Sequence, residues 1–293
     1  MQRLSISQIT TRPLTLEDDL QLCQRLGCAL EIAESKLSTD PVQAREQLAR
    51  IRDSGVRVTS IQPRTLTIFP SASAPDPHDP QARLANLVAS IDLFSEFWPG
   101  LPLLTNTGAD PDGNESRVWN GCLDHYRSLA DHAQAKGMKI ALEALGPSLM
   151  NRNSVLFAFS QARELARVVD KPAFGLCLDL YNSWQDPALG ASITSDKLFL
   201  VQLADWRRPR SLHDRRALGE GTIPLAALLR QIVQSGYAGD YVLEIFSDSV
   251  SDSLWKDKAT LIEAVETSMA RFDDLDREIS AGTSAVGTLV DHP

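Results

Sequence analysis

The chain has 293 residues, of which 43% are hydrophobic, and a formal net charge of −9 at pH 7. This composition is ordinary for a globular protein with a large core, and the length suits one large domain or two small ones. The negative charge argues against a general nucleic-acid surface or an anionic membrane as partner. No apolar run is long enough to span a bilayer, and residues 1–5 lack the form of a secretory signal, so we expect a cytoplasmic protein.

The cysteines show no metal-binding or redox pattern. Cys23, Cys28, Cys122 and Cys177 form no CxxC pair, and Cys177 falls inside a predicted strand, where a small buried hydrophobe is expected. We therefore assign none of them a metal or redox role.

Predicted strands and helices alternate along the chain. Apolar runs bounded by turn residues predict strands over residues 3–11, 28–33, 56–62, 101–105, 139–144, 174–180, 198–204 and 241–246. Amphipathic patterns predict helices over residues 15–26, 40–54, 83–97, 118–136, 154–169, 187–193, 224–235 and 258–277, and Thr15 is the expected N-cap of the first.

Two segments depart from this alternation. Residues 63–80 contain five prolines and few helix formers, and the same kinds of element resume after them, so we expect an ordered excursion over one face of the domain. Residues 279–293 show no periodicity, and we expect a flexible C-terminal tail there.

Eight strands that alternate with helices predict parallel β-α-β units and a single-domain (β/α)₈ TIM barrel over residues 1–278. The competing architecture is a doubly wound open sheet. No Gly-x-Gly-x-x-Gly follows the first strand, which favours the barrel.

Four predicted strands end in an oxygen-bearing side chain. Glu143, Asp179, Gln202 and Glu244 close strands five to eight, and the active site of such a barrel lies at these ends. Converging carboxylates repel unless a cation separates them. An oxygen-only set suits Mn²⁺ or Mg²⁺, with Co²⁺ and Zn²⁺ as alternatives. The other interpretation of each acid is a salt bridge to a neighbouring helix.

The motifs around these residues carry a family resemblance. They are ALEALGP with Glu143, GLCLDLYNSW with Asp179, VQLADWRRPR with Gln202, LGEGTIPL, and GYAGDYVLEIFS with Glu244. Over nearly its whole length the chain resembles the xylose-isomerase-like superfamily of sugar phosphate isomerases and epimerases. The resemblance implies that these four side chains bind a divalent metal, that the substrate is a small carbohydrate-like molecule, and that the protein forms a homo-oligomer.

The chain departs from the ketohexose epimerases of that superfamily at two positions. Gln202 stands at the third ligand position, where those enzymes have histidine, and Asn182 replaces a substrate-contacting histidine three residues after the Asp ligand. An amide oxygen can still bind a metal, and Asn182 can hydrogen-bond a hydroxyl group. Asn182 cannot, however, transfer a proton at neutral pH.

The resemblance implies an isomerase or epimerase that acts on a keto-sugar, polyol or sugar acid. Glu143 and Glu244 would remove and return a proton next to a carbonyl group through a metal-stabilised enediolate. One alternative is a dehydratase of inosose or 3-dehydroshikimate type, in which a β-hydroxyl group leaves. Another is a non-catalytic, subunit-type barrel that keeps the metal for stability.

Further substrate contacts are expected near the strand ends. The arginines of residues 207–216 form either an anion clamp over the metal or a solvated loop with internal Arg–Asp pairs. By analogy with the epimerases, Arg208 is the expected contact of that loop. The other candidates are Asp205, His213, Trp184, Arg64 and Asn106. His213 could instead be a surface residue, and Trp184 could instead cap the barrel core. The strands lack the several histidines of the apurinic-site endonucleases that share this barrel, which excludes that activity.

Overall fold

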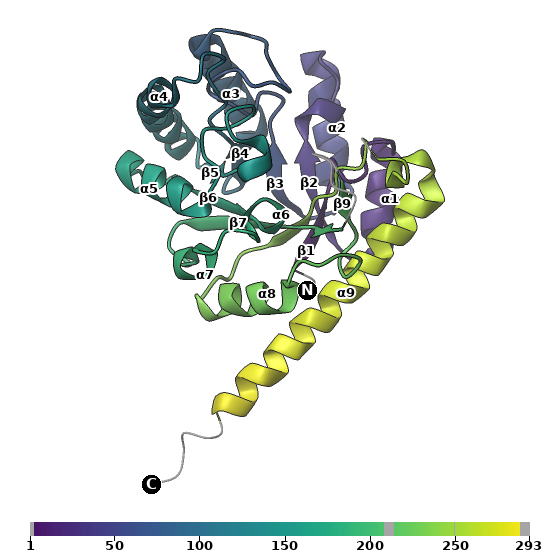
Figure 1. The fold of residues 1–293 in the computed structure, drawn as a ribbon. Coiled ribbons are helices and arrows are strands. Elements are labelled where there is room, and N and C mark those ends of the chain that lie inside the picture. The colour runs from purple at the N-terminus through teal and green to yellow at the C-terminus, as the bar shows by residue number, and fades with distance from the viewer. Residues whose placement is uncertain (1–2, 208–213, 249, 288–293) are drawn as a thin grey trace.

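A closed barrel of parallel strands forms the centre of the protein (Figure 1). The computed structural model describes residues 3–207, 214–248 and 250–287. Around the barrel the strands follow the order β1-β10-β7-β6-β5-β4-β3-β2. Their bounds are β1 Leu4–Ser7, β2 Ala29–Ala33, β3 Val58–Gln62, β4 Pro102–Thr105, β5 Lys139–Glu143, β6 Phe174–Asp179, β7 Leu198–Leu203 and β10 Tyr241–Leu243. The predicted (β/α)₈ barrel is confirmed.

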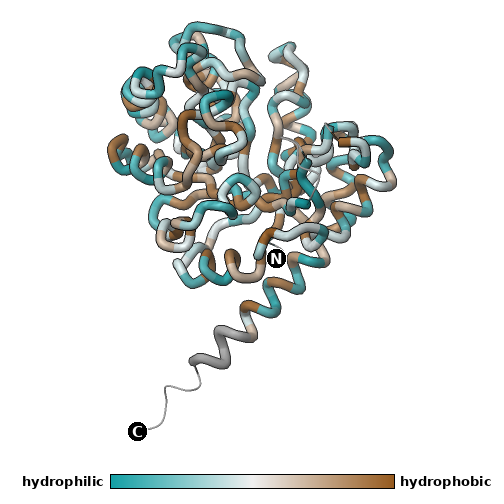
Figure 2. The backbone as a smooth tube through the Cα atoms, viewed as in Figure 1, coloured by the Kyte–Doolittle hydropathy of each residue, from teal (hydrophilic) through white to brown (hydrophobic). Residues whose placement is uncertain are grey.

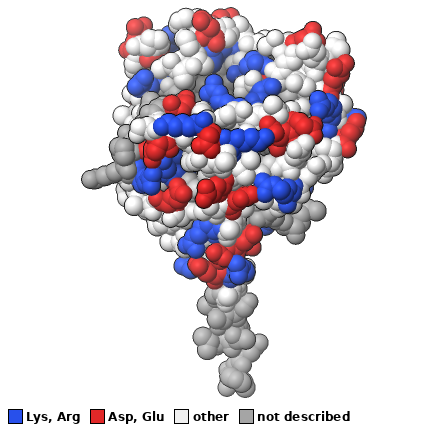
Figure 3. All heavy atoms as spheres, turned by 90° about the vertical axis from the view of Figure 1, so that its right-hand side faces the viewer, with Lys and Arg blue, Asp and Glu red and all other residues white. Residues whose placement is uncertain are grey.

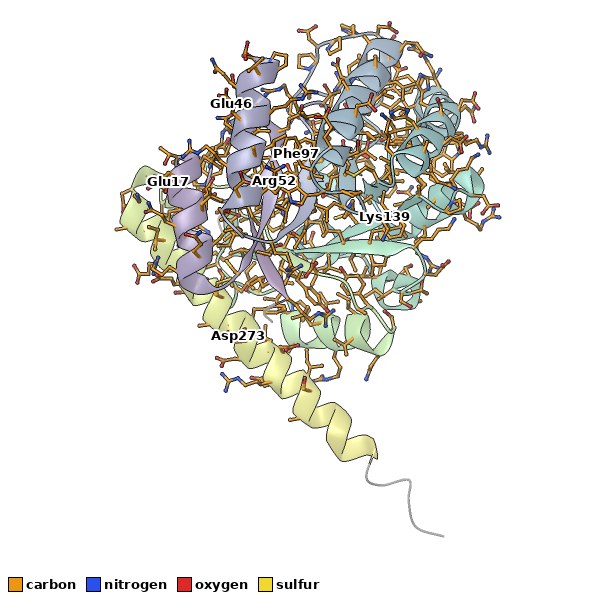
Figure 4. All side chains as sticks on the ribbon, turned by 180° about the vertical axis from the view of Figure 1, so that it is seen from behind. Glu17, Glu46, Arg52, Phe97, Lys139 and Asp273 are labelled. Atoms are coloured by element: carbon orange, nitrogen blue, oxygen red, sulfur yellow. The ribbon has the colours of Figure 1, made fainter. Side chains whose placement is uncertain are left out.

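Helices surround the barrel. The long ones are α1 Leu16–Leu26, α2 Pro41–Asp53, α3 Pro80–Ser95, α4 Glu115–Ala135, α5 Phe159–Val169, α8 Leu225–Gln234 and α9 Lys258–Gly287. The short ones are α6 Leu180–Ser183 and α7 Leu189–Ser192, with 3₁₀ turns η1 Glu34–Lys36, η2 Pro147–Leu149 and η3 Leu254–Lys256. Thr15 caps α1 as predicted, since its side chain accepts a hydrogen bond from the Asp18 amide. Neighbouring helical segments also pack together, as where Arg52 of α2 lies over the Phe97 ring, 5.7 Å from its centroid (Figure 4).

One helix begins later than predicted. We expected α5 to start at Ser154, but it starts at Phe159. Residues before it pair with loops that follow other strands: Leu156 O accepts from the Leu145 amide, and the Val155 amide donates to Thr107 Oγ1. These contacts keep the segment extended, so tertiary pairing overrides its helical pattern.

The core has two layers separated by the barrel wall. Inside the barrel a small apolar cluster contains Leu104, Ala141, Cys177, Leu200 and Val242. The larger cluster lies between the strands and the helices. In Figure 2 the hydrophobic segments accordingly gather in the barrel strands and along the helices that cover them. Cys177 is fully buried, as expected for a small core side chain.

A buried arginine of α3 anchors the proline-rich excursion between β3 and α3. Arg83 of α3 is 1% exposed. Its guanidinium donates to the carbonyl oxygens of Thr67, Ala74 and Pro77 at 2.8–3.2 Å and to the Thr67 hydroxyl group. A buried guanidinium needs such partners, so the excursion and α3 fix each other.

The last helix is longer than predicted. We expected a flexible tail from residue 279, but α9 continues through Gly287, and Ile279 is buried. Residues 279–287 contain no proline to stop the helix, and the buried Ile279 anchors its continuation although the segment lacks an apolar stripe. The end of α9 extends away from the barrel (Figures 1 and 4). The rest of the predicted tail, residues 288–293, lies outside the described residues.

The surface carries interspersed charges. On the face shown in Figure 3, lysine and arginine side chains alternate with aspartate and glutamate side chains. Among the described residues, the helices include none that is both long and apolar enough to cross a membrane.

Gly108, which follows β4, allows a close approach between two loops. Its φ is +76°, and an added Cβ atom would collide with the Phe69 carbonyl group of the excursion. Gly113 has the similar φ of +75° but open space around it. We predict that Gly113→Ala lowers the free energy of unfolding by about 1 kcal/mol through the backbone conformation alone.

For Gly108→Ala we expect a further loss on the order of 2 kcal/mol from the steric clash. Urea denaturation of both variants measures the difference. Equal losses would show that the approach to Phe69 does not constrain the fold.

Candidate active site

The four predicted metal ligands lie at one end of neighbouring strands. Glu143 closes β5, Asp179 closes β6, Gln202 is the penultimate residue of β7, and Glu244 directly follows β10. The strand register pairs Asp179 with Gln202, and Gln202 with Val242. All four side chains are buried, with Glu143 the most exposed at 7%. The structure therefore brings them together as expected, and their role as ligands stays a prediction.

A continuous hydrogen-bond network joins the three carboxylates. Asn182 Nδ2 donates to Glu143 Oε1 at 2.9 Å and to Asp179 Oδ2 at 2.7 Å. Arg215 contacts Asp179 Oδ2 through Nη2 and Glu244 Oε2 through Nη1, both at 2.8 Å. Gln62 Nε2 donates to the other oxygen of Glu244. Each carboxylate thus accepts a hydrogen bond from a polar side chain. An apolar side chain in that place would leave a buried carboxylate oxygen without a donor.

Arg215 enters the site from a short antiparallel ribbon, β8 Asp205–Trp206 and β9 Arg215–Arg216, which the sequence patterns did not predict. Its guanidinium lies 4.6 Å from the Tyr181 ring centroid and 5.1 Å from that of Phe246. The aromatic faces and the two carboxylates therefore fix it in place.

Burial disfavours the ionised form of the glutamates in the site. It raises the pKa of Glu143 well above its ordinary value, and the neighbouring Asp179 and Glu244 raise that pKa further. It also raises the pKa of Glu244 to about 8 and that of Glu31, a fourth buried acid inside the barrel, to about 7. Burial alone would lower the pKa of Arg215, but the carboxylates around it raise that pKa. Among the described residues, Arg215 is the arginine paired with these carboxylates, so the four acids outnumber the positive charge that contacts them.

The donor set fits a divalent cation by its chemistry. Among the described residues, no group of three His, Cys, Asp or Glu side chains is already arranged around a metal position, since Asp179 and Glu244 face Arg215. The Gln202 amide, however, has a buried nitrogen without a partner, while its oxygen accepts from Cys177 Sγ at 3.3 Å. The oxygen and nitrogen of an amide are interchangeable by a flip, so Gln202 can present an unsatisfied oxygen. That oxygen and the surplus negative charge suit a cation with oxygen ligands.

Glu143, Glu244 and Arg215 line a cavity of about 210 Å³, and Asp179 lies behind Asn182 and Arg215 without lining it. One part of its wall is apolar and consists of Leu66, Leu104, Leu145, Leu149 and Phe246. Another part is the excursion, which contributes Thr67, Ser71, Ser73 and Ala74. The predicted contacts Arg64, Asn106 and Asn182 also line the cavity, and Asn106 Oδ1 is buried without a partner.

Other predicted contacts lie elsewhere. Both oxygens of Asp205 accept backbone N–H groups, from Trp206, Gly219, Gly221 and Ile223. Asp205 therefore fixes the glycine-rich loop after β9 and does not line the cavity. Trp184 stacks on Trp206, with ring centroids 5.6 Å apart, and is not part of the cavity wall either.

The arginine-rich segment divides between its two interpretations. Arg207 and Arg216 form ion pairs with Asp252, and Arg216 also pairs with Asp214, which agrees with the internal Arg–Asp pairs of the second interpretation, but Arg216 and Asp214 are buried rather than solvated. Arg215 instead enters the cavity. The predicted contacts Arg208 and His213 lie outside the described residues.

Comparison with known proteins identifies the family. The sequence model of the xylose isomerase-like TIM barrel matches residues 20–270, so the chain belongs to this family, as the motif resemblance predicted. The 3-dehydroshikimate dehydratase of Pseudomonas putida is 31% identical over 252 residues, which cover 80% of this chain and 36% of that protein. The inosose isomerase of Halalkalibacterium halodurans is 26% identical over 166 residues, 52% of this chain and 56% of that protein.

A solved structure, the IOLI protein with a binding zinc atom, shares the fold with a TM-score of 0.74 at 20% identity, over 93% of this chain and 97% of that chain. The curated relatives are enzymes, and the chain matches about a third and about half of their respective lengths. These matches agree on the barrel but differ in the reaction named.

Arg215 is expected to stabilise the metal-free fold strongly. In Arg215→Met, Asp179 and Glu244 lose their buried cation, and we predict that the free energy of unfolding in EDTA falls by roughly 3–5 kcal/mol. Urea denaturation measures this change. Arg50→Met, which removes an exposed pair with Glu17, is the control and should cost less than about 1 kcal/mol. A similar small loss for both variants would mean that the buried ion pairs do not form.

Proposed function

We propose that this protein is a metal-dependent lyase that removes water from a small cyclic hydroxy-ketone. The supporting observation is the cluster of three buried carboxylates at the strand ends, which share Asn182 and Arg215 and of which Glu143 and Glu244 line a cavity with a partly apolar wall. The apolar side chains suit the face of a carbon ring more than a fully hydroxylated open chain. The match to a 3-dehydroshikimate dehydratase over most of this chain supports the same reaction class.

Glu143, Asp179, Gln202 and Glu244 would hold the metal, for which their oxygen donors favour Mn²⁺ or Mg²⁺. When bound, such an ion polarises the substrate carbonyl group and stabilises the negative charge of an enolate. Asn182 donates N–H groups to Glu143 and Asp179, and Gln62 donates one to Glu244. These hydrogen bonds orient the carboxylates.

Glu143 is the proposed base. It lines the cavity, and the described hydrogen bonds engage one of its oxygens, Oε1, through Asn182. Glu143 takes the proton from the carbon next to the carbonyl group, and the protonated Glu143 then gives a proton to the β-hydroxyl group. The C–O bond breaks, water leaves, and a carbon–carbon double bond forms. Both oxygens of Glu244 are engaged, by Gln62 and Arg215, which fits a fixed ligand.

Isomerisation or epimerisation is the second candidate function. Glu244 lines the same cavity as Glu143, and burial raises its pKa to about 8, so it can act as a second proton donor. The partial match to an inosose isomerase supports this reaction class. Both candidates begin with the same proton abstraction and differ in whether the β-hydroxyl group leaves.

Metal binding can be tested without knowing the substrate. We predict that Mn²⁺ at a hundredfold its Kd stabilises the protein by about 2.7 kcal/mol and raises the Tm by roughly 5–10 °C. Asp179→Asn and Glu143→Gln should reduce this shift, because each removes a charged ligand. Glu46→Gln changes an exposed acid of α2 and is the control. A Tm that responds to neither Mn²⁺ nor EDTA would refute the metal site.

The two reactions can be separated in D₂O. The Mn²⁺-loaded protein is incubated with 3-dehydroshikimate and with an inosose, and the products are followed by ultraviolet absorbance and mass spectrometry. If the protein is a lyase, the product is unsaturated and lighter than the substrate by the mass of one water molecule, after correction for incorporated deuterium. Deuterium uptake without an unsaturated product would favour the isomerase.

For Glu143→Gln we expect a loss of roughly 10²–10⁴-fold in either reaction, as for removal of a general base. A metal-dependent Tm shift with no reaction of either substrate would favour the non-catalytic barrel.

A further inference from the structure

Glu31 is a buried acid beneath the proposed metal site that has no part in the mechanism above. It lies in the middle of β2 and is fully buried. Its Oε2 accepts a hydrogen bond from Ser60 Oγ at 2.6 Å, and its Oε1 accepts one from Gln62 Nε2 at 3.4 Å. The same Gln62 nitrogen donates to Glu244 Oε1. A chain of two hydrogen bonds therefore links Glu31 to Glu244.

An irregularity in the pairing of β2 with β3 brings these hydrogen-bonded side chains together. Leu30 pairs with Val58 but Glu31 pairs with Ser60, so Thr59 is an extra residue in β3. As a result, adjacent residues of β3 both direct hydroxyl groups to barrel partners, Thr59 to Ser5 and Ser60 to Glu31. Gln62, two residues after Ser60, lies on the same side. In a regular strand Thr59 and Ser60 would point to opposite sides.

The orientation of the Gln62 amide determines whether Glu244 faces an N–H group or an oxygen atom. An amide has a donating end and an accepting end, and a carboxylate only accepts when ionised. With its nitrogen between Glu31 and Glu244, Gln62 donates to both acids. When both acids are ionised, the reversed amide would turn its oxygen toward two carboxylates and be repelled by them. Glu31 and Glu244 together thus select one of two orientations.

We propose that Glu31 is a positioning residue for Glu244. It holds the Gln62 amide with its N–H groups toward the Glu244 carboxylate, so that Oε1 of Glu244 is fixed by Gln62 while Oε2 is left to Arg215 or to a metal ion. The metal-ion part of this inference rests on the proposed function. The orientation of Glu244 does not.

A double-mutant cycle tests whether Glu31 acts through Gln62. The variants are Glu31→Gln, Gln62→Met and the double variant, and Ser60→Ala is the control because it removes a Glu31 partner without touching Gln62. The amide introduced by Glu31→Gln can donate as well as accept, so it no longer selects the orientation of the Gln62 amide. The measurements are the Mn²⁺ affinity, from electron paramagnetic resonance titration, and the Tm of the metal-free protein.

We expect each single variant to weaken Mn²⁺ binding by on the order of tenfold, as for other residues that orient metal ligands. The double variant should lose about the same tenfold, because the second change removes nothing further. Ser60→Ala should keep the affinity of the wild type within about twofold, even where its Tm falls. A hundredfold loss in the double variant, or unchanged affinity in Glu31→Gln, would overturn the proposal.

Crystal structures of the wild type and Glu31→Gln provide an answer that needs no metal. If the wild type binds no Mn²⁺, the proposed function fails, and the position of the Glu244 side chain decides this inference. A Glu244 carboxylate that turns away from Gln62 or Arg215 in Glu31→Gln supports the positioning role. An unchanged Glu244 together with an unchanged Gln62 amide refutes it.

Discussion

The burial of several carboxylates at one end of the barrel is the constraint on which the site depends. An unpaired carboxylate in a low-dielectric interior is unstable, so each must meet a donor or a cation. Asn182 and Gln62 provide donors, and Arg215 provides the cation that contacts Asp179 and Glu244. Since these groups are shared between carboxylates, the strand ends behave as one electrostatic unit.

This unit depends on loops that are themselves anchored by buried polar groups. Asp205 accepts backbone N–H groups of the glycine-rich loop that follows Arg215, and so fixes the end of the ribbon that carries the guanidinium. On the other side of the cavity, Arg83 holds the excursion through three carbonyl groups. In both cases one charged side chain satisfies several backbone groups, which allows irregular segments to form a defined wall without regular secondary structure.

The sequence was sufficient to predict the barrel and the position of its four strand-end residues. Strand periodicity and parallel connections place Glu143, Asp179, Gln202 and Glu244 on neighbouring strands without any knowledge of side-chain contacts. Arg215 was not singled out, because five arginines lie within ten residues of that segment and only the ribbon distinguishes them.

Glu31 and Gln62 were missed for different reasons. Glu31 lies in the apolar run of a predicted strand, as Glu143 does, but in its middle and not at its end, where active-site residues of such a barrel are expected. The side to which Gln62 points depends on the extra residue in β3, which strand patterns do not reveal. Sequence periodicity cannot predict the direction of a side chain that depends on a backbone irregularity or on a contact with a residue distant in sequence.

The two glutamates of the site are held differently, and this asymmetry bears on the chemistry. Glu244 has a donor on each oxygen, whereas Glu143 has Asn182 on one. Asn182, at one of the two positions where the chain departs from the ketohexose epimerases, orients Glu143 and Asp179 but cannot accept a proton at neutral pH. Within the described residues the groups of the cavity lining that can transfer a proton include the carboxyl groups of Glu143 and Glu244. Under the proposed function, one fixed and one freer glutamate suit a reaction in which a single group both takes and returns the proton, whereas an epimerase with a glutamate on each face would need both to move.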